Sequence, residues 1–276
     1  MIFAASVAIF QRDIKKTIAY STCSQLGYMF VGCAVGRYDS GMFHLLTHGF
    51  FKALLFLSAG SIIHATHEQD MHKMPANLWK KMPWTFVMML IGTLSIVGIP
   101  PFSGFYSKDS IIEALFVNHE HFLIGKFAYI CSIITVFLTA FYSWKLIFKI
   151  FFSKSTEEKE SHESDSAILS PMLILSIFAL TSGFILMKYL GILEYHSTFW
   201  SNIIIIRGNE NHHISMIIEF IPLILSIFGL FVAYYLFMAR DSKFNIKILE
   251  NKLYIDEAYR KIFAGPFDPR FHPDDF

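Results

Sequence analysis

The sequence predicts an all-α membrane protein: a polytopic bundle of about six full transmembrane spans, one of them broken, with part of a further helix at the N-terminus. Hydrophobic residues make up 54% of the 276 residues and charged residues only 16%, which is more apolar and less charged than an ordinary soluble domain. Apolar stretches recur along the chain at lengths near the about 20 residues that cross a bilayer. The chain also contains 30 Phe, and aromatic residues of this kind suit lipid-facing helices and membrane interfaces.

Six apolar stretches are the predicted spans. The first ten residues, MIFAASVAIF, are apolar but too short to cross a bilayer. They have no basic region and no cleavage site, so we interpret them as the tail of a helix rather than as a signal peptide. The spans are expected at residues 17–36, 41–65, 82–117, 122–152, 167–187 and 214–238.

The distribution of positive charge orients these spans. If successive connections lie alternately on the two sides, 17 Lys and Arg residues fall on one side and four on the other. The positive side faces the cytoplasm or the mitochondrial matrix. We therefore expect the first connection, the polar linker 153–166 and the amphipathic tail to lie there. A net charge of +1 gives no sign of a nucleic-acid partner.

The three cysteines lie inside apolar stretches and have no CxxC spacing. They are Cys23, Cys33 and Cys131. We expect buried thiols, and neither disulfides nor metal ligands.

The segment HLLTHGFFKALLFL places three ionisable residues on one face of an apolar helix. His44, His48 and Lys52 stand at i, i+4 and i+8, so their side chains stack over two turns. A lysine at the bilayer centre costs roughly 2.5–3.5 kcal/mol on insertion scales. The stripe is therefore expected to face protein or water, where it can carry protons because histidine titrates near neutrality.

Two other interpretations of this stripe stay open. An HxxxH pair on a helix also suits zinc, and a metal-binding module could add His64 and His67 from the following loop, although no third ligand has convincing spacing. The residues could also act as polar contacts between helices. Three aligned ionisable groups favour a functional role, because such groups are rare in lipid. We expect no metal site.

The segment GTLSIVGIPPFSGFYSKDSIIEAL predicts a broken transmembrane helix. Pro100 and Pro101 must interrupt the helix, because proline lacks the N–H and clashes with the preceding turn. Broken helices in membranes mark ion or substrate sites. Lys108, Asp109 and Glu113 follow the break, which makes them candidate transport residues. Alternatively, Lys108 extends to an interface or is neutralised by Asp109.

Basic residues also cluster where the first full span begins, in QRDIKKTIAYSTCSQLGYM. For Lys16 the simplest role is to determine topology. Lys15 could also form the cytoplasmic end of a hydrated proton path.

These segments together resemble a known family. QRDIKKTIAYSTCSQLGYMF, FHLLTHGFFKALLFLSAGSIIHATHEQDMHKM and GIPPFSGFYSKDSIIEAL are similar to the antiporter-like membrane subunits of respiratory complex I, most closely to the type called subunit 5 in mitochondria and subunit L in bacteria. The likeness covers roughly residues 1–115. NKLYIDEAYRKIF, at 251–263, resembles the segment before that subunit's lateral helix, whereas 122–242 is similar in hydropathy alone.

The resemblance implies a role for each candidate residue. In this family two inverted five-helix repeats each hold a half-channel and a broken helix with a key lysine, and this chain resembles the second repeat and the helices after it. Lys108 matches the lysine of the second broken helix. His44, His48 and Lys52 match the central polar axis, and Lys15 matches the lysine beside the cytoplasmic end.

The resemblance also implies four parts and a set of partners. The parts are the second repeat at 1–152, the polar linker at 153–166, two additional transmembrane helices at 167–238 and an amphipathic tail at 239–276. The chain would be a proton-translocating subunit of NADH–quinone oxidoreductase without redox chemistry of its own. NADH, flavin, iron–sulfur clusters and quinone would be bound by partner subunits, in a bacterial cytoplasmic or mitochondrial inner membrane.

The family's first repeat, lateral helix and final span have no counterpart here, and the ending DPRFHPDDF fits no part of the pattern. We therefore expect either one piece of a split subunit, whose N-terminal repeat is a separate chain, or a truncated non-functional product. A subunit of a multisubunit cation/proton antiporter is the other alternative, because it shares the broken-helix lysine pattern.

Overall fold

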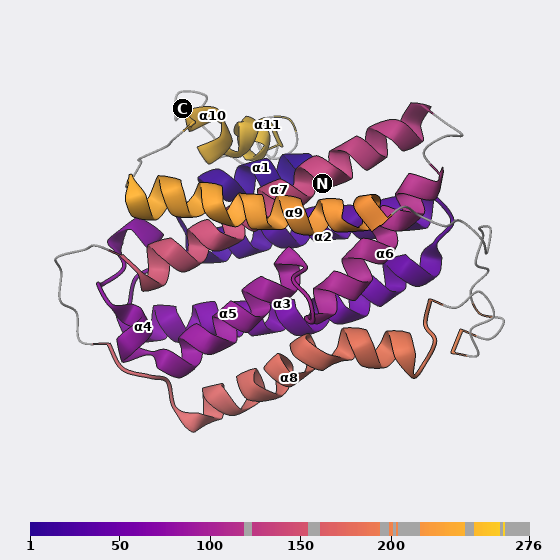
Figure 1. Cartoon of the computed structure of the whole chain (residues 1–276). Coiled ribbons are helices and arrows are strands. Elements are labelled where there is room, and N and C mark those ends of the chain that lie inside the picture. Colours follow the sequence, from indigo (N-terminus) through magenta and orange to yellow (C-terminus); the bar gives the residue numbers. More distant parts are fainter. Residues whose placement is uncertain are drawn as a thin grey trace. The chain divides into compact units, whose positions relative to one another are not determined.

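The structure, a computed structural model, describes residues 1–118, 123–153, 161–193, 199–200, 203, 216–240, 246–259 and 262. These residues contain helices and no strand (Figure 1). The chain divides into two compact units, Met1–Ser242 and Lys243–Phe276. The ending DPRFHPDDF and residues 154–160 of the polar linker lie outside the described residues, and the four-part division stays a prediction.

The first unit consists of helices joined by short connections where the structure describes it. They are α1 (Ile2–Phe10), α2 (Ile14–Ala34), α3 (Tyr38–Thr66), α4 (Leu78–Lys81), α5 (Pro83–Val97), α6 (Ser103–Asn118), α7 (Leu123–Phe151), α8 (Ser166–Lys188) and α9 (Met216–Tyr234). A 3₁₀ turn, η1 (Met71–Lys73), follows α3, and a π-helical turn, η2 (Tyr235–Ala239), continues α9. The second unit contains α10 (Lys247–Glu250), the 3₁₀ turn η3 (Lys252–Tyr254) and α11 (Ile255–Tyr259).

Four of the described helices are long and apolar enough to cross a membrane. They are Tyr38–Thr66, Ile124–Phe151, Ser166–Lys188 and Phe220–Ala239. The helix α2 has the length but carries many polar side chains, and the break divides the third predicted span into two short helices, α5 and α6. The expected count of about six full spans is therefore not confirmed.

The long helix α3 is the centre of the first unit. It packs against α2, α5, α6 and α8, while α7 packs against α1 and α9. Figure 1 shows α8 running along the α3 and α5 side and α9 running alongside α7. The largest apolar core cluster includes residues of α2, α3, α5, α7 and α8. The residues of α3 that face inward are therefore surrounded by protein.

The N-terminus of α2 is fixed by its own sequence. The Asp13 carboxylate accepts hydrogen bonds from the backbone N–H groups of Lys15 (2.7 Å) and Lys16 (3.2 Å), which satisfies two donors that a helix start leaves free. Asp13 also forms an isolated antiparallel bridge with Asp70, in the loop after α3. The basic start of α2 is thereby held beside the end of α3.

The broken helix lies at the proline pair, as predicted. The helix α5 ends at Val97 and α6 begins at Ser103, with Pro100 and Pro101 between them. Gly98 closes α5 with a φ of +84°, a left-handed conformation that glycine adopts without steric cost. The interruption therefore needs both the glycine and the prolines.

Other side chains complete the hydrogen bonding around the break. The Ser226 hydroxyl of α9 donates to the Val97 carbonyl (3.1 Å), and the Gly104 N–H donates to Ser95 Oγ (3.3 Å). A Cβ on Gly104 would collide with the Ser95 backbone carbonyl, so the start of α6 can approach α5 closely because residue 104 is glycine. Backbone groups that a break frees inside a membrane have to be satisfied in this way.

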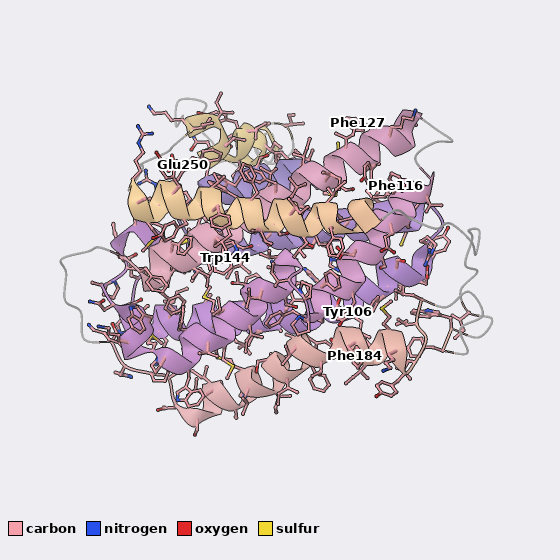
Figure 2. All side chains as sticks on the ribbon, viewed as in Figure 1. Tyr106, Phe116, Phe127, Trp144, Phe184 and Glu250 are labelled. Carbon is pink, nitrogen blue, oxygen red and sulfur yellow. The ribbon has the colours of Figure 1, made fainter. Side chains whose placement is uncertain are left out.

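Aromatic rings fix α6 between its neighbours. Figure 2 shows Tyr106 of α6 beside Phe184 of α8, and their ring centroids are 6.4 Å apart. On the same helix Phe116 meets Tyr129 of α7, with centroids 5.5 Å apart. The helix after the break is thus held on two sides.

Lys145 is not the loop residue that the charge count assumed. It lies within α7 and is 4% exposed, and its Nζ donates to the backbone carbonyls of Ile9 (2.7 Å) and Gln11 (2.9 Å). A cation at the C-terminal end of a helix satisfies free carbonyls and suits the helix dipole. Lys145 therefore fixes the end of α1 against α7.

Glu163, from the polar linker, caps the start of α5, where its partners Trp84 and Thr85 precede it by 79 and 78 residues. Its carboxylate accepts from the backbone N–H groups of Trp84 (2.8 Å) and Thr85 (3.3 Å) and from the Thr85 hydroxyl. The neighbouring Ser164 hydroxyl forms a hydrogen bond with the Ser61 hydroxyl of α3 (Oγ–Oγ, 2.7 Å). The linker end thereby connects α8 to the start of α5.

The expectation of three buried thiols is wrong. Cys23 is exposed, and Cys33 and Cys131 are partly exposed. They occupy apolar helices but face away from the interior of the first unit, which hydropathy does not distinguish. All three are free.

Candidate functional site

The three ionisable residues of α3 lie inside the first unit. His44 is 1% exposed, His48 5% and Lys52 4%. The rings of His44 and His48 have centroids 6.0 Å apart, and Phe51 packs edge-on against His48 at 5.3 Å. Because α3 is central, this stripe faces other helices.

His44 joins α2, α3 and α6. Its Nε2 lies 3.1 Å from Gln25 Oε1 on α2, and its Nδ1 lies 2.9 Å from Ser107 Oγ on α6. An amide oxygen only accepts hydrogen bonds, so Nε2 donates to Gln25, while the other ring nitrogen, Nδ1, bonds to the Ser107 hydroxyl. The Thr47 hydroxyl also donates to Ser107 (2.7 Å). The stripe is therefore connected to the helix that follows the break.

Lys52 is held by α2 at the other end of the stripe. Its Nζ donates to Ser21 Oγ (2.7 Å) and to the Ile18 carbonyl (3.2 Å). Ser21 is in turn hydrogen-bonded to Tyr142 OH on α7 (2.7 Å). Lys52, Ser21 and Tyr142 form a continuous polar chain across three helices.

Lys108 lies in α6, directly after Ser107, and is 1% exposed. Its Nζ lies 5.5 Å from the centroid of the Tyr28 ring, which is within cation–π range. No described residue accepts a hydrogen bond from that nitrogen. The Lys108 side chain passes the break, since its Cδ lies 3.8 Å from the position that a Cβ on Gly98 would take.

The remaining predicted residues differ in their placement. Asp109 and Glu113 are half-buried on α6, and Asp109 interacts electrostatically with both Lys108 and Glu113. Lys15 is exposed at the basic start of α2. Asp109 and Glu113 therefore lie beside Lys108, whereas Lys15 lies at the surface.

Several polar residues of the site were not among the predicted ones. On α2, Ser21 and Gln25 recur at helical spacing inside an apolar segment, a signal that could have been read from the sequence. Ser107 could have been suspected from its position beside Lys108. Tyr142 stands in a long apolar stretch full of aromatic residues, and nothing in the sequence distinguishes it from them.

The histidines do not assemble a metal site in the part of the chain that the structure describes. No group of three or more His, Cys, Asp and Glu side chains there could hold a metal ion. His64 and His67 face each other with ring centroids 6.4 Å apart.

Comparisons with known proteins agree on one family. A family model described as "NADH:quinone oxidoreductase/Mrp antiporter, TM" matches residues 1–135. NADH-quinone oxidoreductase subunit L of Rickettsia bellii (strain RML369-C) is 42% identical, with 97% of this chain and 43% of that protein aligned. NADH-ubiquinone oxidoreductase chain 5 of Chondrus crispus is 38% identical, with 96% and 43% aligned.

A solved structure shares the fold. A chain in the structure of the Mrp complex from Dietzia sp. DQ12-45-1b aligns with a TM-score of 0.66 and 18% identity, over 98% of this chain and 30% of that one. The chain spans less than half the length of the curated relatives it matches. Residues 1–135 match the model of that family, and the alignments with the subunit L and chain 5 proteins cover 96–97% of this chain.

Proposed function

We propose that this chain carries protons across an energy-converting membrane as part of an NADH–quinone oxidoreductase. The observation that carries the proposal is the double hydrogen bond of His44, which connects the α3 stripe both to α2 and to Ser107, the residue before Lys108. Ionisable groups buried among apolar helices are costly, and they mark ion or proton pathways in membrane proteins.

The proposed path runs along α3. Lys108, beside the break, and Lys52, two turns from His44, are its two lysines, and His44 and His48 lie between them. Imidazoles and hydroxyls can both donate and accept protons. Asp109 and Glu113 are the acidic residues that follow Lys108 on α6. Lys15, at the basic start of α2, is the proposed end of the path on the cytoplasmic or matrix side.

The free energy that a proton-carrying residue has to supply is small compared with the cost of burying a charge. Moving one charge across 100 mV is worth about 2.3 kcal/mol. A residue that passes a proton through such a field has to change its proton affinity by a comparable amount. An amine that gains and loses an acidic neighbour can do so, which is the role we assign to Lys108 and Asp109.

NADH oxidation and quinone reduction take place, in this proposal, in other subunits. This chain contributes no redox chemistry, and NADH, flavin, iron–sulfur clusters and quinone are bound by its partners. The partners are the other membrane subunits of the complex, including a chain that supplies the missing N-terminal repeat if the subunit is split. The chain crosses a bacterial cytoplasmic or mitochondrial inner membrane about six times when α2 and the broken helix count as spans.

Fractionation of native membranes tests the proposal. The chain should co-migrate with NADH-dependent quinone reductase activity. Sealed membrane vesicles should acidify or alkalinise on one side when NADH is added, and Lys108→Ala should reduce that signal. Migration of the chain apart from all NADH-oxidising activity would overturn the proposal.

A multisubunit cation/proton antiporter is the second candidate, favoured by the family description, which covers both classes. The same vesicles distinguish the two. An antiporter moves protons when a sodium or potassium gradient is imposed without NADH, whereas the proposed subunit responds to NADH and quinone and is insensitive to such a gradient.

A further inference from the structure

A small internal cavity lies beside Lys52. Its volume is about 20 Å³, which is enough for one water molecule. Aliphatic side chains form part of the wall, and six polar side chains form the rest. The polar residues are Thr17, Ser21, Lys52, Thr93, Tyr142 and Ser143. The hydroxyl and amine groups of these side chains are of the kind that a buried water bonds to.

The Lys52 amine has a donor left for this cavity. An ammonium group has three N–H donors, and the protein accepts two hydrogen bonds, at Ser21 Oγ and at the Ile18 carbonyl. Since Lys52 also lines the cavity, the third donor can reach a molecule inside it. Tyr142 fixes this arrangement from α7, because its OH is 2.7 Å from Ser21 Oγ and its side chain is 2% exposed.

The cavity lies close to the basic start of α2. Thr17, in its wall, stands one turn from the helix cap, and its hydroxyl donates to the Asp13 carbonyl (3.0 Å). Ser21 is eight residues from Asp13, which corresponds to about 12 Å along a helix. The exposed Lys15 and Lys16 lie on that first turn. The cavity therefore stands between the inner stripe of α3 and the positively charged end of α2.

We propose that the cavity binds one water molecule that carries a proton between Lys52 and the basic end of α2, and that Ser21 and Tyr142 are positioning residues for the Lys52 amine. This inference rests on the proposed function. In the outward step an N–H bond of the Lys52 ammonium breaks and an O–H bond forms on the water. Another proton of that water passes to the Thr17 or Ser143 hydroxyl, which releases its own proton to bulk water at the exposed first turn of α2. Lys52 is left neutral and the water is regenerated.

Four variants of the chain in its native complex test the positioning role. Tyr142→Phe keeps the ring and removes the hydroxyl, Ser21→Ala removes the central hydroxyl, and Ser21→Thr keeps one. Ser143→Val adds carbon atoms at the cavity wall and displaces the water. Vesicle proton translocation and uncoupled NADH–quinone reductase activity are measured from pH 6 to 9.

Ser143→Val and Ser21→Ala should slow translocation at least about tenfold, since small displacements of a reacting group have effects of this size, and uncoupled reductase activity should change less. Tyr142→Phe should shift the pH at which translocation is half-maximal, and Ser21→Thr should restore the Ser21→Ala loss. The matched controls are Ser58→Ala, whose buried hydroxyl donates only to Leu54 O of its own helix, and Tyr189→Phe, an exposed tyrosine. Both should pump as the unmodified protein does.

The outcomes separate this inference from the proposed function. If Lys52→Ala stops translocation while Tyr142→Phe and Ser143→Val keep wild-type rate and pH profile, the water site is wrong and the proposed function stands. If Lys52→Ala pumps normally, the proposed path itself is wrong. A structure of the unmodified complex that resolves waters elsewhere in the bundle should contain one bonded to Lys52 Nζ, and an unfilled cavity there would overturn the inference independently of any variant.

Discussion

The two buried lysines of the first unit have opposite surroundings. Lys52 donates hydrogen bonds to a hydroxyl and a carbonyl of α2, at 2.7 and 3.2 Å. Lys108 is as deeply buried, but no described residue accepts a hydrogen bond from its nitrogen, which lies 5.5 Å from the centroid of the Tyr28 ring. One side chain is held in place by protein hydrogen bonds, whereas the other is not.

This difference indicates different roles within one proposed path. A buried charge that is hydrogen-bonded is stabilised in one position, whereas an unpaired one costs several kcal/mol. A change in the surroundings, such as the approach or withdrawal of the Asp109 carboxylate, should therefore change the free energy of the Lys108 ammonium more than that of Lys52. Lys52 is suited to pass protons from a fixed position. We therefore expect substitutions at the two lysines to have different effects on proton translocation and on stability.

The largest effect is expected at Lys108. Lys108→Ala should reduce proton translocation at least about tenfold, and Lys108→Arg should not restore it, because arginine keeps its proton and requires acceptors for five N–H groups. The measurement is NADH-driven proton movement in vesicles, with Lys126→Ala, an exposed lysine of α7, as the control. Wild-type pumping by Lys108→Arg would show that Lys108 is a fixed structural charge.

The thermal stability of the two lysine variants should change in opposite directions. Lys108→Met removes a buried amine for which no described residue is a hydrogen-bond acceptor, and it should stabilise the bundle by about 1–4 kcal/mol. Lys52→Met removes two hydrogen bonds from a charged donor and should destabilise it by roughly 1.5–3 kcal/mol. The midpoint of thermal unfolding of the purified complex in detergent measures both. Shifts of the same sign would contradict the contrast between the two sites.

His48 should show an intermediate effect. Its Nε2 has no hydrogen-bond partner among the described residues, so His48→Ala removes a proton carrier and breaks no structural bond at that atom. Translocation should fall several-fold, while quinone reductase activity without a gradient should change less. His64→Ala, at an exposed histidine of the same helix, should leave both unchanged. Equal losses of both activities at His48 would indicate a general structural defect.

The smallest effect is expected at Glu163, outside the path. Glu163→Ala removes the cap of α5 and should lower the unfolding midpoint by an amount that corresponds to about 1 kcal/mol. Glu163→Gln keeps an acceptor and should lose less. Asp165→Asn is the control, because that side chain makes no capping hydrogen bond. If the Glu163 variants change translocation more than stability, this end of α5 belongs to the path after all.

Much of the fold could be predicted because membrane helices are visible as apolar stretches. The residue pattern also located the break, since Pro100 and Pro101 leave no alternative to an interruption, and it identified the α3 stripe by its spacing of four. What it could not supply was the partner of each group. Tyr142 and Lys145 meet residues more than a hundred positions away, and spacing along one helix contains no information on such contacts.

The number of full spans was harder to predict for a related reason. Hydropathy treats a stretch such as 82–117 as one segment, whereas the structure contains two short helices. At the break between them, Ser226 donates to the Val97 carbonyl and Ser95 accepts from the Gly104 N–H. Polar α2 is covered on its inner side by α1 and α3. Tertiary packing, rather than the apolar content of each segment, decides whether these helices can lie in a membrane.

The capping of α5 by Glu163 has a consequence for the order of synthesis. The backbone donors of Trp84 and Thr85 are translated 79 and 78 residues before the carboxylate that satisfies them. At about 5–20 residues per second, a ribosome needs roughly 4–16 seconds to make that interval. During this time the backbone N–H groups at the start of α5 have to donate to water or to another acceptor. The whole of α7 is translated before Glu163. The attachment of α5 to the linker is therefore among the last contacts of this region to form during translation.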